Sequence, residues 1–185
     1  MTTFPIHDVA SAPEGSKAIL ENLQKTLGHI PGLFGALAES PAAITAYPVI
    51  SDLFDKTSLS PAEQQLLLIA ISVENECHFC VPAHTVIAKN VAKVDADLVN
   101  AVRESRSTGD AKIDALVTFA KELVKARGHA SDAQIEAFLA AGYNKAQVLE
   151  VILGVTLKTF SNYVSHITNP PLGAFQSEAW SPAQD

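Results

Sequence analysis

Apolar residues recur at helical spacing along most of the chain. Between residues 14 and 28, for example, Ile19, Leu23 and Leu27 fall on one face, and Gly28 follows as a helix stop. No run alternates between apolar and polar positions for more than a few residues, so we expect an all-α protein. The pattern predicts helices at about residues 14–28, 33–38, 41–55, 61–73, from 77–80 onward, 95–104, 113–124, after Ser131, and from 145 to Asn169.

The helix that begins at Pro61 is predicted to be central. Ser60-Pro61-Ala62-Glu63 combines an N-cap serine, a proline in the first turn and a glutamate that closes a capping box. Behind this signal, Leu66 to Val73 is apolar on almost every face, as in a helix with neighbours all round. Because Pro82 fits only the first turn of a helix, we expect the next helix to begin close to Cys77–Cys80.

Composition narrows the class of protein. A length of 185 residues predicts one domain, with residues 1–13 and 170–185 as irregular arms. Apolar residues make up 48%, and this surplus favours burial between subunits of a homo-oligomer. A net charge of −7 without a basic block argues against binding to nucleic acids or anionic membranes. There is no apolar run long enough to span a membrane and no apolar signal-peptide core, so we expect a cytoplasmic protein.

The two cysteines lie in Cys77-His78-Phe79-Cys80, and His84 follows four residues later. In a helix these spacings bring Cys77, Cys80 and His84 to one face. A thiol attacks as its thiolate, and an ordinary cysteine has a pKa of about 8.5. A helix start at Cys80 and a histidine one turn later both favour the thiolate. We therefore predict a redox-active dithiol that needs no cofactor.

Two alternatives use the same residues. Cys77, Cys80 and His84 could hold a metal, with His78 or His166 as the fourth ligand, although no second CxxC or HxxxH motif completes the set. The cysteines could also be inert core thiols, since free cysteine is often buried. His78 lies between the cysteines, where it either tunes them or faces solvent.

Other polar residues near the motif have a structural and a functional interpretation. The capping-box position of Glu63 favours a helix cap over a catalytic acid. Glu74 and Glu76 precede the cysteines and are predicted to be solvated, with a proton relay as the alternative. Asn162 and His166 are an i, i+4 pair, interpreted as hydrogen-bonded core residues, with a pocket wall as the alternative.

Three stretches of the chain resemble one known superfamily. LSPAEQQLLLIAISVENECHFCVPAH is similar to the core of the carboxymuconolactone decarboxylase/alkylhydroperoxidase D (AhpD-like) superfamily, and HIPGLFGALAESPAAITAY looks like its preceding helices. KTFSNYVSHITNPPLGAFQSEAW resembles the C-terminal part of one bacterial branch. The specific CxxCxxxH motif falls on Cys77, Cys80 and His84. The resemblance implies an all-helical domain that assembles as a trimer or a larger ring such as a hexamer.

The resemblance also implies roles for these residues. Cys80 would attack a peroxide, Cys77 would resolve the product as a disulfide, and His84 would take part in a proton relay. A dithiol protein, thioredoxin-like or lipoyl, would be the reductant. Peroxidase members place a glutamate twelve residues before the first cysteine to withdraw the thiol proton, and this chain has Gln65 there, which cannot act as a base. Glu63 would point elsewhere, so Glu74, Glu76 or a water takes over, or peroxidase turnover is weak.

The expected function is therefore a thiol-dependent peroxidase, an oxidoreductase in antioxidant defence. One alternative is a general disulfide oxidoreductase that uses the same dithiol. Another is a non-redox carboxymuconolactone decarboxylase-like enzyme or a binding protein of that fold. Decarboxylation is the less favoured activity because that branch typically lacks the paired cysteines.

Overall fold

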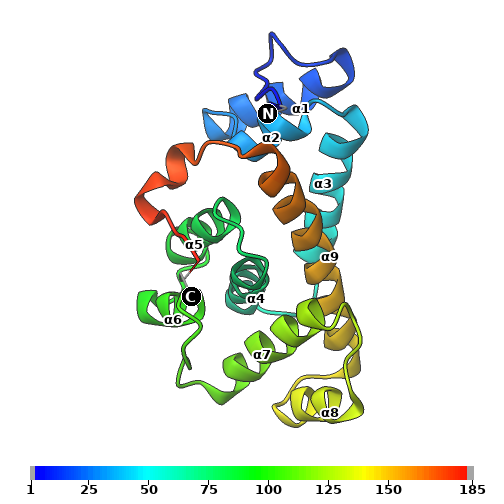
Figure 1. Cartoon of the computed structure of the whole chain (residues 1–185), viewed down its shortest axis with the longest axis vertical. Helices are drawn as coiled ribbons and strands as arrows, with labels where there is room; N and C mark the ends of the chain where they lie inside the picture. Colours follow the sequence, from blue (N-terminus) through cyan, green and yellow to red (C-terminus); the bar gives the residue numbers. More distant parts are fainter. Residues whose placement is uncertain (1–2, 183–185) are drawn as a thin grey trace.

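The computed structural model describes residues 3–182. Within that range it contains α-helices and one 3-10 helix and no strand, which confirms the all-α prediction (Figure 1). The elements are α1 Glu14–Leu27, α2 Gly32–Leu37, α3 Pro41–Phe54, α4 Pro61–Glu74, α5 Cys80–Asn90, α6 Ala96–Arg103, α7 Ala111–Lys125, α8 Asp132–Ala140, α9 Lys145–Thr168 and η1 Gly173–Glu178.

Helix α4 lies at the centre of the fold, as its sequence predicts. It packs against α5, α6, α7 and α9, which surround it in Figure 1. Its residues 66–72 are all buried, because apolar side chains on every face have neighbours on every side. The predicted capping box is present: Ser60 N–H donates to Glu63 Oε2 over 2.8 Å, and Glu63 N–H donates to Ser60 Oγ over 3.3 Å.

The long helix α9 forms one wall of the molecule and packs on α2, α3, α4, α5 and α7. It packs tightly at Gly154, where a Cβ atom would lie 3.0 Å from side-chain atoms of both Leu67 and Phe54. A larger residue there would push α9 away from α3 and α4. The C-terminal half of α9 thereby faces the start of α5, where the cysteines lie.

The C-terminal tail differs from the predicted irregular arm. Its residues Gly173–Glu178 form the 3-10 helix η1, which lies against α5 (Figure 1). Phe175 packs edge-on against Phe79 with ring centroids 5.7 Å apart. Glu178 accepts from Lys89 over 2.9 Å and from Arg103 over 2.7 Å. These contacts hold residues 173–178 against the rest of the fold. Helix periodicity in the sequence cannot reveal them, because they are tertiary contacts. The first two and the last three residues of the predicted arms lie outside the described residues.

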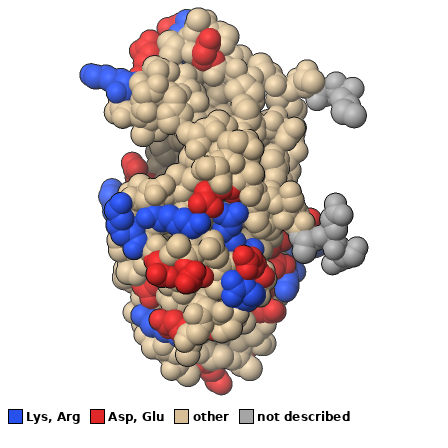
Figure 2. Space-filling model, turned by 90° about the vertical axis from the view of Figure 1, so that its left-hand side faces the viewer, with Lys and Arg blue, Asp and Glu red and all other residues tan. Residues whose placement is uncertain are grey.

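The surface in Figure 2 carries no large field of one sign. Acidic and basic side chains are interspersed over the lower part of this face, and the upper part is mostly uncharged. Separately, none of the helices within residues 3–182 is both long enough and apolar enough to cross a membrane.

Candidate dithiol active site

The two cysteines lie in the turn between α4 and α5 and in the first turn of α5. Helix α5 begins at Cys80, which confirms the prediction made from Pro82. The Cys80 N–H donates to Cys77 Sγ over 3.3 Å, so the backbone holds the first sulfur beside the second residue. Both thiols are free and are only 0% and 1% exposed. The site is therefore a closed pair of thiols at a helix N-terminus.

A polar stripe on α9 faces Cys80. Ser165 Oγ and Ser161 Oγ lie 3.7 and 4.0 Å from Cys80 Sγ. Asn162, fully buried, accepts from Asn75 Nδ2 over 2.9 Å and donates to Ser72 Oγ over 3.4 Å. Its amide also lies near the Cys80 sulfur and lowers the pKa of that thiol. These contacts supply donors to a sulfur that is closed off from water.

A chain of hydrogen bonds links Gln65, His84 and Lys158. His84 Nδ1 lies 3.0 Å from Gln65 Oε1, and His84 Nε2 lies 2.9 Å from Lys158 Nζ. The amide oxygen of Gln65 can only accept, so Nδ1 carries the proton and Nε2 accepts from the Lys158 ammonium. Burial, followed by the charge of Lys158, holds the pKa of His84 well below its ordinary value. His84 is therefore neutral, with both ring nitrogens occupied.

The pKa values of the two thiols are shifted in opposite directions. Burial raises the pKa of Cys80, but the hydrogen bond from Cys77, the charge of Lys158 and the hydrogen bonds from Ser165 and Asn162 outweigh it, so this pKa lies well below its ordinary value. For Cys77, the hydrogen bond with Cys80 raises the pKa, and burial raises it further. The opposite directions of the two shifts favour a thiolate at Cys80 over one at Cys77.

Lys158 remains charged although it is buried. Burial lowers its pKa, but the acidic groups around it, Cys80 first and then Tyr47 and Cys77, outweigh that effect and leave the pKa above the ordinary value. Tyr47 of α3 lies near the same group, and burial raises the pKa of its hydroxyl. The phenol is therefore neutral. The site then contains one cation and one anion, in surroundings that screen neither from the other.

The structure brings some of the candidate residues together and separates others. Asn162 lies beside Cys80, and Gln65 is hydrogen-bonded to His84, one turn after Cys80 on α5. His166, one turn after Asn162, is exposed and packs against Tyr163 instead. His78 is half-buried, and its Nε2 atom has no hydrogen-bond partner among residues 3–182.

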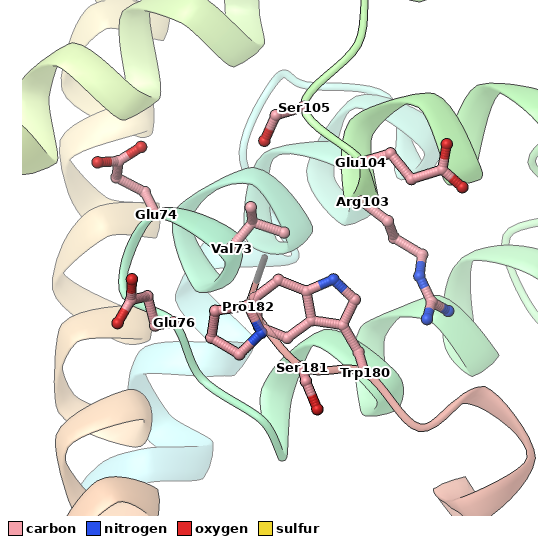
Figure 3. Close-up of a pocket in the computed structure, with 9 residues that line it drawn as sticks. All are labelled: Val73, Glu74, Glu76, Arg103, Glu104, Ser105, Trp180, Ser181 and Pro182. Atoms are coloured by element: carbon pink, nitrogen blue, oxygen red, sulfur yellow. The ribbon is translucent and has the colours of Figure 1, made fainter. Parts of the chain in front are cut away.

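None of the hydrogen bonds or ion pairs within residues 3–182 joins Glu63, Glu74 or Glu76 to a cysteine. Glu63 closes the capping box and also accepts from Tyr143 Oη over 3.1 Å and from Lys112 Nζ over 3.0 Å, as expected of a cap. Glu74 and Glu76 line a separate surface pocket of about 490 Å³ beside Trp180 (Figure 3). The Glu74 carboxylate lies 3.7 Å from Lys125 Nζ. Neither acid is hydrogen-bonded to the Gln65–His84–Lys158 chain, so neither replaces the glutamate absent at position 65.

Sequence reasoning missed Lys158, Ser161 and Ser165. Together with Asn162 they occupy positions i, i+3, i+4 and i+7 of α9, and all four are buried. A polar stripe at that spacing within an apolar helix is a readable signal of a functional face. It can be found without knowing the fold.

The arrangement of the side chains also bears on the alternative that Cys77, Cys80 and His84 hold a metal ion. Among residues 3–182 there is no group of three or more histidine, cysteine, aspartate or glutamate side chains arranged to hold a metal ion. His84 directs one nitrogen to an amide oxygen and the other to an ammonium group. A cation in contact with the proposed ligand opposes the binding of a second cation.

Known structures share this architecture. The chain superimposes on an alkylhydroperoxidase AhpD core, a peroxidase-related protein from Ralstonia eutropha JMP134, with a TM-score of 0.81, 21% identity and 93% of each chain covered. A peroxidase-related protein from Silicibacter sp. TM1040 gives a TM-score of 0.78 at 20% identity, over 93% of this chain and 92% of that one. The debrominase Bmp8, in complex with 2,3,4-tribromopyrrole, gives 0.75 at 14% identity, over 96% and 97%. No curated protein sequence matches the chain.

The fold is therefore that of AhpD-like proteins. Residues 45–122, which include both cysteines, match the carboxymuconolactone decarboxylase family. This match agrees with the resemblance of the sequence to the same family.

Proposed function

We propose that the protein is a dithiol peroxidase in which Cys80 attacks the peroxide and Cys77 resolves the product. The observation that carries the proposal is the paired geometry at the start of α5. Cys80 N–H donates to Cys77 Sγ over 3.3 Å, and the polar face of α9 lies against Cys80 Sγ. This arrangement assigns different protonation states to two sulfurs within reach of each other, which is what an attacking and a resolving thiol require.

The reaction consists of two steps. The Cys80 thiolate attacks the terminal oxygen of a hydroperoxide, the O–O bond breaks, and the sulfur is oxidised to a sulfenic acid as the peroxide is reduced to an alcohol or water. The Cys77 thiol then displaces the sulfenic oxygen, so that an S–S bond forms and water leaves. A partner dithiol supplies two electrons and two protons to restore the thiols.

Burial of the sulfurs favours a small substrate. Both cysteines are at most 1% exposed, and Phe79 and Phe175 pack together over the start of α5. A hydroperoxide can diffuse to such a site through small movements of side chains. A protein disulfide would have to bring its own backbone to the sulfurs, so this observation disfavours a general disulfide oxidoreductase.

The burial of the two sulfurs also affects which reductant can reach their disulfide. Of the two partners that we expect, a dihydrolipoyl group is a small dithiol on a flexible arm, whereas a thioredoxin-like protein presents its thiols on a folded surface. The lipoyl arm reaches a buried disulfide with less rearrangement, so we propose it as the reductant. A cytoplasmic location would supply such a partner.

We also propose that the chain acts as a homo-oligomer, a trimer or hexamer. The outer face of α9 exposes Leu149, Ile152, Tyr163 and Ile167, between 44% and 67% of each. Large apolar side chains gathered along one helix are typical of a face that another subunit covers.

The test is hydroperoxide consumption in the presence of dihydrolipoamide. The proposal predicts multiple turnovers for the wild type, none for Cys80→Ser and a single turnover for Cys77→Ser, which then stalls as a sulfenic acid. Equal residual turnover in the two variants would contradict these roles. Bromide release from 2,3,4-tribromopyrrole in the absence of peroxide consumption would assign the dithiol to dehalogenation.

A further inference from the structure

Lys158 is a buried cation that forms no ion pair with a carboxylate of residues 3–182. It is only 1% exposed. Its nearest hydrogen-bond partner is His84 Nε2 at 2.9 Å, which is uncharged. Burying an ammonium group is costly unless an anion compensates its charge. Some other group near Lys158 must therefore be the anion.

Of the groups around Lys158, one can be the anion that compensates its charge. From α3, Tyr47 is a neutral phenol, because burial raises its pKa. From α4, Gln65 reaches the site as an uncharged amide that hydrogen-bonds His84. From the turn before α5, Cys77 keeps its proton. The remaining group is Cys80 of α5, whose sulfur lies against Ser161 and Ser165 on the same buried face of α9 as Lys158.

We propose that Lys158 is the acid of the peroxidase reaction: its ammonium holds Cys80 as a thiolate and then protonates the oxygen that leaves the peroxide. This inference rests on the proposed function and adds a residue to it. Lys158 thereby takes the part that the resemblance assigns to a glutamate at the position of Gln65. Lys158 acts through its positive charge and by donating a proton, whereas the glutamate of the peroxidase members acts by withdrawing a proton from the thiol.

The atoms and charges balance. Before the reaction the site holds Cys77–SH, Cys80–S⁻ and Lys158–NH₃⁺, a net charge of zero. Attack on the peroxide gives Cys80–SOH, the leaving alkoxide takes a proton from Lys158, and an alcohol departs from a neutral amine. Condensation with Cys77 releases water and leaves a disulfide beside Lys158–NH₂, again with zero charge. Reduction returns a proton to Lys158, because the re-formed Cys80 thiol ionises beside the amine. The thiolate and the ammonium thus disappear together, so no buried charge is ever unpaired.

Two substitutions separate the roles of Lys158. Lys158→Met removes the charge at similar length, whereas Lys158→Arg keeps a charge that cannot be given up as a proton. Lys145→Met, at the exposed start of the same helix, is the control. The first measurement is the pH midpoint of Cys80 alkylation by iodoacetamide in a Cys77→Ser background. It needs no peroxide, so it tests the pairing of Lys158 with Cys80 even if the peroxidase function fails.

The inference predicts three results. Lys158→Met raises the alkylation midpoint by at least about one pH unit, because the thiolate loses the cation that stabilises it. Lys158→Arg restores the midpoint, but single-turnover reaction with hydrogen peroxide is about 100-fold slower than in the wild type, the range in which general acids contribute. Lys145→Met leaves both values unchanged. An unshifted midpoint in Lys158→Met overturns the pairing, and a wild-type peroxide rate in Lys158→Arg overturns the role as acid.

A measurement on the unmodified protein covers the case in which a variant does not fold. Stoichiometric oxidation of the wild type is followed with a pH indicator in weak buffer. If Lys158 supplies the proton and stays neutral, no proton is taken from solution as the disulfide forms. If Lys158 keeps its charge, one proton per chain is taken up, and that outcome overturns the inference.

Discussion

The Lys158 ammonium donates to His84 Nε2 over 2.9 Å, and this contact makes His84 an acceptor. A histidine whose Nε2 accepts from a cation and whose Nδ1–H is bound to Gln65 has no free position with which to withdraw a proton from Cys80. In the account proposed above, His84 orients Lys158, and Lys158 acts on the sulfur. The role of the histidine in the CxxCxxxH motif is then one of positioning.

Replacing Gln65 with glutamate should change His84 more than it changes the reaction. A carboxylate beside Nδ1–H favours the imidazolium, so the pKa of His84 should rise toward or above its ordinary value of about 6.5. Because Cys80 is already ionised, the peroxide rate should rise less than about threefold. The measurement is an NMR titration of His84 together with single-turnover kinetics. A rate gain of an order of magnitude or more (~1.4 kcal/mol of barrier) would show that a base at position 65 had been limiting.

Asn162 and His166 should give opposite results on substitution. Asn162→Leu removes a polar group that lowers the pKa of Cys80. The alkylation midpoint of Cys80 should therefore rise by about one pH unit or more. His166→Leu, one turn later on the exposed side of α9, is the matched control and should leave the midpoint in place. Equal midpoints in the two variants would remove Asn162 from the site.

Glu63→Gln should lower stability without altering the thiols. The carboxylate accepts from Ser60, Tyr143 and Lys112, and losing part of this cap should cost about 1 kcal/mol, or a fall in Tm of about 2–4 °C. Thermal unfolding and Cys80 alkylation measure the two effects. A changed alkylation midpoint at unchanged Tm would instead make Glu63 part of the active site.

The same variant should also alter the pH dependence of stability. Burial raises the pKa of Glu63, but hydrogen bonds from Ser60, Lys112 and Tyr143 outweigh it and lower the pKa in the folded state. The stabilisation is therefore present above the unfolded-state pKa of about 4.3 and is lost as the pH falls through the depressed value. Denaturant unfolding of Glu63→Gln should show a shallower loss of stability in this range than the wild type.

The outer face of α9 should control assembly. Ile167→Lys places a charge among side chains that we propose to lie between subunits, so it should convert the trimer or hexamer to smaller species. Leu27→Lys, at the C-terminal end of α1 and 53% exposed, is a control of the same chemistry. Light scattering after size-exclusion chromatography gives the masses. A monomeric wild type, or the same mass for both variants, would contradict the proposal.

Local signals in the sequence predict the helices well because the causes are local. Ser60, Ser131 and Asn144 each begin a capping box in the structure, and Gly28 adopts the left-handed conformation that ends α1. The 3-10 helix of the tail could not be predicted in this way, because its order depends on contacts such as those of Glu178 with Lys89 and Arg103.

The residues of the candidate site were also only partly predictable from the sequence. Cys77, Cys80 and His84 are adjacent in sequence, so their spacing identifies them. Lys158 lies 74 positions from His84 and meets it only because α9 packs beside α5. The polar stripe on α9 shows that this face has a role, but the partner of that face is set by the fold.

The most direct test of the central claim is to count free thiols per chain before and after one equivalent of hydroperoxide, and to map the product by peptide mass spectrometry. The account predicts a fall from two thiols to none, a disulfide between Cys77 and Cys80, and full recovery on addition of dihydrolipoamide. Two thiols that persist after the peroxide has been added would contradict it.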